Sequence, residues 1–237
     1  MTIPQKLPAI LALAASISIL LSSILCLAFK MTAFTSYMDV THEGTSMIGI
    51  SSSSYRPNSL FYLYPKYLMP VKRAPVVVAG SFGLVIGLAI TWLVASSFRR
   101  KRAWNLNFRQ RTTLITILGA NALLVTISMI YVLVQHGRSA HFDPEYVSHK
   151  LVVFYDKGYF SLEEWTCEIP LYVTELGNTS MREQCVGERA SRMLMIVLCV
   201  FSLAMPGLLL WDLNTTQGVV AKAELRRRDS WEDDDSE

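Results

Sequence analysis

The residues of this chain that could carry redox, metal or nucleophilic chemistry are few and widely spaced. The cysteines are Cys26, Cys167, Cys185 and Cys199. The histidines are His42, His136, His141 and His149. No Cys-x-x-Cys, His-x-x-His or His-Glu-x-x-His spacing occurs, so neither disulfide exchange nor a helix-borne zinc site is indicated. A Gly-x-Ser-x-Gly motif and a phosphate-binding glycine loop are also missing, and we expect a non-enzymatic protein with no catalytic residue, metal or cofactor.

Two of the cysteines are better suited to a structural disulfide. Cys167 and Cys185 close an acidic, polar stretch that also contains a glycosylation sequon at Asn178. Disulfides and N-linked glycans both form on the secretory side of a membrane. We therefore predict a Cys167–Cys185 disulfide and a glycan on Asn178. His136 and His141, near the start of the same loop, are expected to be solvated.

The elements that must position these residues are long apolar runs in a chain that is 51% hydrophobic and only 17% charged. The runs cover about 7–29, 75–98, 112–134 and 193–213. Each reaches the ~20 residues that a helix needs to cross the hydrocarbon core, and only a helix satisfies its own backbone there. We predict an all-α polytopic membrane protein, with a four-transmembrane-helix bundle over 1–213 and a disordered cytosolic tail over 214–237. A cleaved signal peptide is the alternative for the first run, although that run exceeds the about 7–15 residues of a secretory apolar region.

A basic cluster predicts the orientation of the bundle. The short loop over 99–111 has no acidic residue and begins with Arg99, Arg100, Lys101 and Arg102. Short basic loops remain in the cytosol, so both termini are expected there. The first loop (30–74) and the third loop (135–192) then face outward or into a lumen, in the plasma membrane or an endomembrane. Anionic lipid at the cytosolic face is a candidate partner, whereas nucleic acid is not expected, since no basic face on a folded domain is indicated.

The third loop carries two capping boxes, which predict two helix starts. At Ser161, the hydroxyl is expected to accept from the Glu164 amide, and the Glu164 carboxylate to accept from the Ser161 amide. This box predicts a short helix over 162–169, ended near the following proline. A second box, at Ser180, would open a long, extended fourth helix over about 181–213. The disulfide would then staple the short helix to the projecting start of the long one.

Aromatic residues of the two predicted outer loops are candidates for binding partners. In the third loop these are Tyr159, Trp165 and Tyr172, because aromatic residues dominate interface energetics. Burial against a helix or against the membrane surface is the alternative for them. In the first loop, 41–59 has the composition of a flexible segment. The aromatic run over 60–68 would be either a belt at the membrane interface or a lid over the third loop.

Small and polar residues inside the runs predict how the bundle packs. Ala79, Gly83 and Gly87 recur at four-residue spacing, which permits close helix approach. The serines of the first run and Asn121 in the third are expected to bond between helices. The unpaired cysteines inside the runs are expected to act as plain apolar residues. A Pro-Gly pair at 206–207 predicts a local kink.

The tail is basic and then acidic, which is typical of a solvated segment. Ser230 lies between an arginine run and an acidic run, so it is a phosphorylation candidate. A phosphate there would weaken the attraction of the basic patch to anionic lipid.

The segment from Ser161 through Glu164-Trp165-Thr166-Cys167 to Cys185, followed by Ala190-Ser191-Arg192, resembles filamentous-fungal four-span integral membrane proteins. These are broadly tetraspan-like, but the tetraspanin Cys-Cys-Gly motif and the claudin motif in the first loop are both missing here. The resemblance implies a fungal membrane protein and no known site. The function expected is that of a non-enzymatic scaffold or organiser that binds other membrane proteins. The alternatives are a small transporter, channel or channel-accessory subunit and, third, a membrane enzyme without a known motif.

Overall fold

The computed structural model describes residues 3–42, 47–50, 59–69, 74–99, 108–149, 154–172 and 179–234. Helices dominate these residues, as predicted, and four of them are long and apolar enough to cross a membrane. The candidate spans are Ile10–Asp39, Ala74–Ser96, Thr112–Gly137 and Ser180–Trp211. The predicted fold class, a helical four-span membrane bundle with an extended fourth helix, is confirmed.

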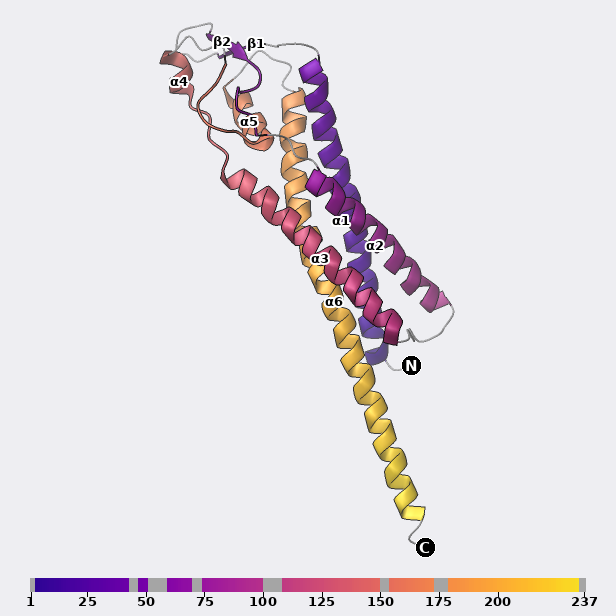
Figure 1. Ribbon diagram of the computed structural model, residues 1–237. Helices are drawn as coiled ribbons and strands as arrows, with labels where there is room; N and C mark the ends of the chain where they lie inside the picture. The colour runs from indigo at the N-terminus through magenta and orange to yellow at the C-terminus, as the bar shows by residue number, and fades with distance from the viewer. Residues whose placement is uncertain are drawn as a thin grey trace.

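Two helices are longer than predicted, and they lie side by side (Figure 1). The helix α1 runs over Ile3–His42, so the first loop does not begin at residue 30. The helix α6 runs over Thr179–Asp234 and packs along α1. No glycine or proline interrupts residues 30–42, so nothing in the sequence ends α1 at the edge of its apolar run.

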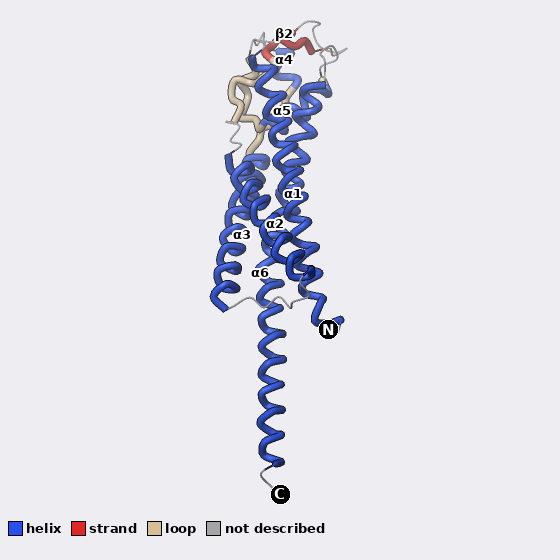
Figure 2. The backbone as a smooth tube through the Cα atoms, turned by 90° about the vertical axis from the view of Figure 1, so that its right-hand side faces the viewer, coloured by secondary structure: helices blue, strands red, loops and turns tan. Residues whose placement is uncertain are grey.

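The prediction of a disordered tail over 214–237 was wrong for the part that the structure describes. The helix α6 continues to Asp234 and projects alone beyond the bundle, at the end where the N-terminus also lies (Figures 1 and 2). Past Gly218 the sequence has no glycine or proline, and residues 221–228 (AKAELRRR) are all good helix formers. The helix also passes through Pro206 without ending. At its other end it begins at Thr179, so Ser180 lies within the helix and does not cap it.

The other two spans are α2, over Ala74–Arg99, and α3, over Phe108–Gly137. Small residues let α2 approach α1 closely at two of the predicted positions, Gly83 and Gly87. Ala79 is fully buried. A Cβ on Gly83 would lie 2.5 Å from the Ser23 hydroxyl, and one on Gly87 would lie 3.2 Å from backbone atoms of Leu20. The contact is within the bundle.

The interior of the bundle is mostly apolar. Isolated hydrogen bonds between polar side chains join neighbouring helices. Its buried core includes Ile19, Ile90, Leu118, Val125, Met195 and Leu198. Asn121 Nδ2 donates to Ser202 Oγ at 3.3 Å, and Thr91 Oγ1 donates to Ser16 Oγ at 3.1 Å. The predicted bonding between helices is therefore seen for Ser16 and Asn121 only. Ser18 and Ser22 donate to carbonyls of their own helix, and Ser23 Oγ is buried without a hydrogen-bond partner among the described residues. Cys26 and Cys199 are buried free thiols.

The remaining elements gather at one end of the bundle (Figures 1 and 2). They are the strands β1 (Met47–Ile50) and β2 (Ser59–Tyr62), the helices α4 (Pro144–His149) and α5 (Leu162–Glu168), and one 3₁₀ turn, η1 (Ile169–Leu171). We call these elements, with the connecting residues 63–69, 138–143 and 154–161, the head subdomain. The strands pair antiparallel with Met47 opposite Tyr62, so the expectation of a flexible segment over 41–59 was wrong where β1 forms.

Candidate functional site

The head subdomain is joined covalently to the bundle. The Cys167–Cys185 disulfide links α5 to the first turns of α6, with a Cα–Cα distance of 4.9 Å. The prediction that the bridge docks the short helix onto the projecting one is confirmed. In the chain-entropy model a loop of this size contributes about 3 kcal/mol to stability.

Of the two hydrogen bonds predicted for the capping box of α5, one is formed and the other is replaced. Ser161 Oγ accepts from the Glu164 amide at 3.2 Å. The Ser161 amide, however, donates to Ser139 Oγ at 2.8 Å and not to the Glu164 carboxylate. The Glu164 carboxylate is therefore not engaged with the N-terminus of α5. Phe160, which precedes the cap, packs against Trp165 with ring centroids 4.9 Å apart, which is the contact known as a hydrophobic staple.

An aromatic core fills the head subdomain. Trp165 is fully buried, and its ring contacts those of Phe142, Tyr155 and Phe160. Its indole N–H donates to the Leu63 carbonyl at 2.8 Å. Trp165 therefore cannot be part of an exposed binding face, and the alternative of burial holds for this residue. Burial of a ring this large against other rings is the main source of cohesion in so small a unit.

The aromatic run of the first loop forms a lid over the third loop. The Phe160 amide donates to the Tyr67 carbonyl at 3.1 Å, and the Met69 amide donates to the Phe160 carbonyl at 2.8 Å. Leu63 is buried in the aromatic core. Of the two alternatives for 60–68, the lid is therefore the one seen for its described residues. Burial raises the pKa of Tyr64 to about 12, while its hydroxyl donates to Gln184 Oε1 at 3.1 Å.

Other aromatic side chains of the head subdomain remain exposed. Tyr159 is 62% exposed and Tyr67 is 38% exposed, and their ring centroids lie 5.4 Å apart. The ammonium of Lys66 lies over the Tyr67 ring, 5.3 Å from its centroid. Gly158, with φ of 93°, forms the turn that precedes Tyr159. Tyr172 is partly buried against Phe142, so of the three predicted face residues only Tyr159 is exposed.

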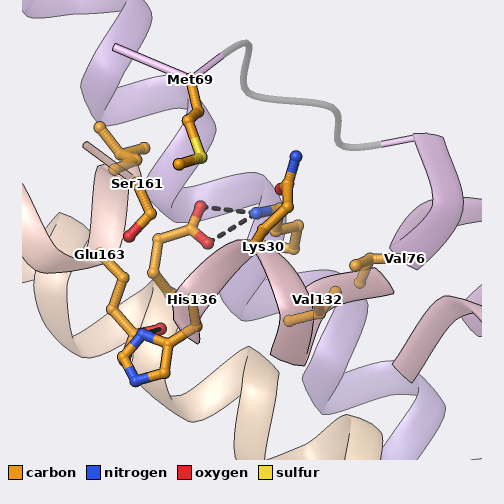
Figure 3. Close-up of a pocket in the computed structure, with 10 residues that line it drawn as sticks. Lys30, Met69, Val76, Val132, His136, Ser161 and Glu163 are labelled. Atoms are coloured by element: carbon orange, nitrogen blue, oxygen red, sulfur yellow. Dashed lines mark hydrogen bonds and ion pairs between the residues drawn. The ribbon is translucent and has the colours of Figure 1, made fainter. Parts of the chain in front are cut away.

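Ion pairs lie where the head subdomain meets the bundle, and Figure 3 shows one of them, at Lys30. Lys30 of α1 contacts Glu188 of α6, with nitrogen–oxygen distances of 2.6 and 2.7 Å. The two side chains are only 10% and 11% exposed, so the pair is largely buried. Arg192 Nη2 donates to Glu163 Oε1 at 2.7 Å and so ties α6 to α5. Sequence reasoning missed Lys30, because it lies just past the predicted end of the first span.

The ion pairs line a small recess of about 50 Å³. Lys30, His136, Glu163 and Glu188 contribute its polar walls, while Val76 and Val132 close it from α2 and α3 (Figure 3). A space of this size holds one or a few waters and is far below the about 300–1,000 Å³ of a small-molecule site. The recess therefore belongs to the junction between the two parts and is too small to be a ligand pocket.

Histidines and carboxylates meet on the surface of the head subdomain. Glu168 Oε1 lies 2.6 Å from His141 Nδ1, and Glu168 Oε2 accepts from the Phe142 amide at 2.6 Å. One ligand atom each from His141, Glu164 and Glu168 lie within 4.8 Å of one another. The hydrogen bond to Glu168 raises the pKa of His141. His136 Nδ1 lies 3.1 Å from Glu164 Oε1, so His136 is not simply solvated as predicted.

The structure does not describe the side chains of several predicted site residues. Arg100, Lys101, Arg102 and Asn178 are outside the described residues. Arg99 is the last residue of α2, and Ser230 lies on α6. Their roles in topology, glycosylation and phosphorylation therefore stay predictions.

The fold and the head subdomain together define a class, that of an integral membrane protein with four spanning helices and a disulfide-linked extramembrane unit. No protein-family model, curated protein or solved structure matches the chain.

Proposed function

We propose that this protein is non-enzymatic and that it binds and organises other membrane proteins through its head subdomain. The observation that carries the proposal is the exposed Tyr67–Tyr159 pair on a tightly packed support. Exposed tyrosines are favourable contact residues because they bury a large area at little entropic cost. The lid, the disulfide and the ion pairs hold the pair in place, which lowers the ordering cost of binding.

The position of the pair indicates the kind of partner. The Tyr159 carbonyl accepts from the Ala140 amide at 2.8 Å, and Ala140 closely follows the end of α3 at Gly137. The pair therefore lies near the level at which α3 leaves its apolar segment. A partner that reaches this level is another membrane protein that stands beside the bundle.

The proposal includes an orientation with the head subdomain outside the cytosol. The basic residues Arg99 to Arg102, the sequon at Asn178 and the disulfide support it. Both termini would then be cytosolic, with anionic lipid near the basic loop and Ser230 within reach of kinases. The proposal also includes kinship with the filamentous-fungal four-span proteins that residues 161–192 resemble.

A small transporter, channel or channel-accessory subunit is the second candidate, and the buried charges of Lys30 and Glu188 favour it. Intramembrane ionisable residues often mark a transport path. In the described residues, however, these charges lie level with Val76 and Val132, near the head end of α2 and α3. Deeper in the bundle the buried polar residues that the structure describes, such as Ser16, Asn121 and Ser202, carry no charge. A transport path would normally place ionisable groups along the span, so we rank this function second.

Crosslinking in the native cell followed by co-purification tests the proposal. Wild-type chain is compared with a Tyr67→Ala/Tyr159→Ala variant and with Leu171→Ala as the matched control, since Leu171 is 78% exposed on the same subdomain. We expect the double variant to reach its membrane normally. The amount of a stoichiometric partner recovered with it should fall at least tenfold, while the control recovers as much partner as the wild type. Equal recovery from all three chains would remove the proposed face.

Two further measurements separate the alternatives. Solute flux through purified protein in liposomes would favour the transporter and contradict the organiser. A Cys167→Ser/Cys185→Ser variant that reaches its membrane but loses the partner would support a functional face. Retention with misfolding would instead identify the disulfide as a structural requirement only.

A further inference from the structure

We propose that His141, Glu164 and Glu168 form a binding site for a divalent transition metal of the Zn²⁺ class. One ligand atom from each residue lies within 4.8 Å of the other two. Nitrogen and oxygen ligands on a metal at about 2.0–2.2 Å are separated by roughly 3–4 Å, so small rotations of these side chains complete the geometry.

The charge balance of the neighbourhood supports a cation at this place. Along the described residues, Glu163 is paired with Arg192 and Glu188 with Lys30. Glu164 and Glu168 have no lysine or arginine partner there, and the only basic groups that contact them are histidines. With neutral histidines the two carboxylates leave an uncompensated negative charge, which a divalent cation would neutralise.

Secondary interactions already orient the ligands. Glu164 and Glu168 are four residues apart on α5, so they share one face of that helix. The Phe142 amide holds Glu168 Oε2 at 2.6 Å and leaves Oε1 directed at His141. A hydrogen bond of this kind, which fixes a ligating carboxylate, is a common support of metal sites.

A second histidine, His136, lies next to Glu164. His136 Nδ1 is buried and lies 3.1 Å from Glu164 Oε1, in a geometry that does not make a hydrogen bond. A small rotation of the Glu164 carboxylate toward a metal would let His136 donate to its second oxygen. His136 therefore acts as a positioning residue in this proposal.

The ligand set indicates which metal would bind. Mixed imidazole and carboxylate ligands suit Zn²⁺ and its transition-metal neighbours, whereas Mg²⁺ and Ca²⁺ prefer oxygen ligands alone. The side chain of His141 is 78% exposed, so the site is open and water would complete the coordination. A bound metal would join α5 to the connection between α3 and α4.

Zn²⁺ titration of the purified full-length chain, followed by calorimetry and thermal unfolding, tests the site. We expect one Zn²⁺ per wild-type chain, a higher unfolding temperature with Zn²⁺, and at least tenfold weaker binding in His141→Ala and in Glu164→Gln. Matched controls on the same subdomain are His149→Ala and Glu145→Gln, which remove a histidine and a carboxylate outside the three ligands. The controls should bind Zn²⁺ as the wild type does.

Folding and metal identity are checked separately. His141 is exposed, so His141→Ala keeps the aromatic core and its circular dichroism should match that of the wild type. Co²⁺ in place of Zn²⁺ should produce visible absorption bands that His141→Ala loses. The proposal is overturned by the lack of saturable Zn²⁺ binding, by binding that survives His141→Ala, by equal loss in His149→Ala, or by tighter binding of Ca²⁺ than of Zn²⁺.

Discussion

The bundle and the head subdomain are held together by different means. In the bundle, α1 and α2 meet through small residues such as Gly83 and Gly87, and polar groups pair singly. In the head subdomain, large rings pack around Trp165, and a disulfide and ion pairs surround them. Lipid removes the hydrophobic drive between helices, so close backbone approach decides packing there. Outside lipid, burial of rings is favourable, but a small unit gains further stability from a staple.

The junction between the head subdomain and the bundle differs from both regions. The side chains of the Lys30–Glu188 pair are only 10% and 11% exposed, and Val76 and Val132 line the same recess, so little water screens the two charges. Each charge there depends on its partner, because an unpaired buried charge is costly. The junction is therefore the part of the molecule most sensitive to single charge changes.

The largest expected effect is on the aromatic core. Trp165→Ala should destabilise the head subdomain by about 3–5 kcal/mol, because a large buried side chain is replaced by a cavity. It also removes the hydrogen bond to the Leu63 carbonyl. Limited proteolysis and denaturant unfolding measure the loss, and the bundle should remain helical. Tyr159→Ala is the control, since Tyr159 is exposed and should cost little. If the bundle unfolds together with the head subdomain, the two regions are one cooperative unit and are not stabilised independently.

The junction is tested by a double-mutant cycle on Lys30 and Glu188. Lys30→Met alone should cost about 3–5 kcal/mol, because it leaves the Glu188 carboxylate buried without a partner. Adding Glu188→Leu should recover most of that loss, since no unpaired charge remains. Thermal unfolding in detergent measures each corner of the cycle. Additive effects of the two changes would mean that the pair is not coupled.

The close approach of α1 and α2 is tested by an alanine at Gly87. Its Cβ would lie 3.2 Å from the Leu20 backbone, so the helices must separate, and we expect a cost of about 1–3 kcal/mol. Gly119→Ala is the matched control in α3, because a Cβ there meets nothing within 4 Å. Unfolding in detergent should distinguish the two variants. Equal stability of both would show that small residues do not decide packing in this bundle.

The smallest expected effect concerns pH and Tyr64. Burial raises the pKa of this phenol from 10.0 to about 12, so the folded state holds its proton more tightly than the unfolded chain does. The resulting stability is fully present below pH 10.0 and is lost as pH rises toward about 12. Spectrophotometric titration of the tyrosines should lose one late-titrating phenol in Tyr64→Phe, while Tyr155, whose pKa burial also raises, should still titrate late. An unchanged titration curve in that variant would mean that the lid does not bury Tyr64.

The local patterns of the sequence predicted which helices exist but did not predict where those helices end. Apolar length was enough to find the four spans, and the serine at position 161 was enough to start α5. The ends of α1 and α6 were missed, because hydropathy reports where a helix leaves lipid and not where the helix stops. Trp165 was a candidate for a binding face because composition alone does not distinguish a buried ring from an exposed one. The strand β1 lay in a segment whose serine-rich composition favours a flexible loop.

What the sequence determined by itself is the four-span helical class and the Cys167–Cys185 pair, because apolar length and a pair of cysteines in one polar loop are local signals. Only the tertiary structure decided which distant residues meet. Lys30 and Glu188 are 158 positions apart, and Trp165 and Leu63 are 102 positions apart. The cluster of His141 with Glu168, 27 positions away, has no motif spacing, because its side chains come from α5 and from the connection between α3 and α4, which the fold of the head subdomain brings together. Contacts of this kind depend on the packing of whole elements, which no short pattern encodes.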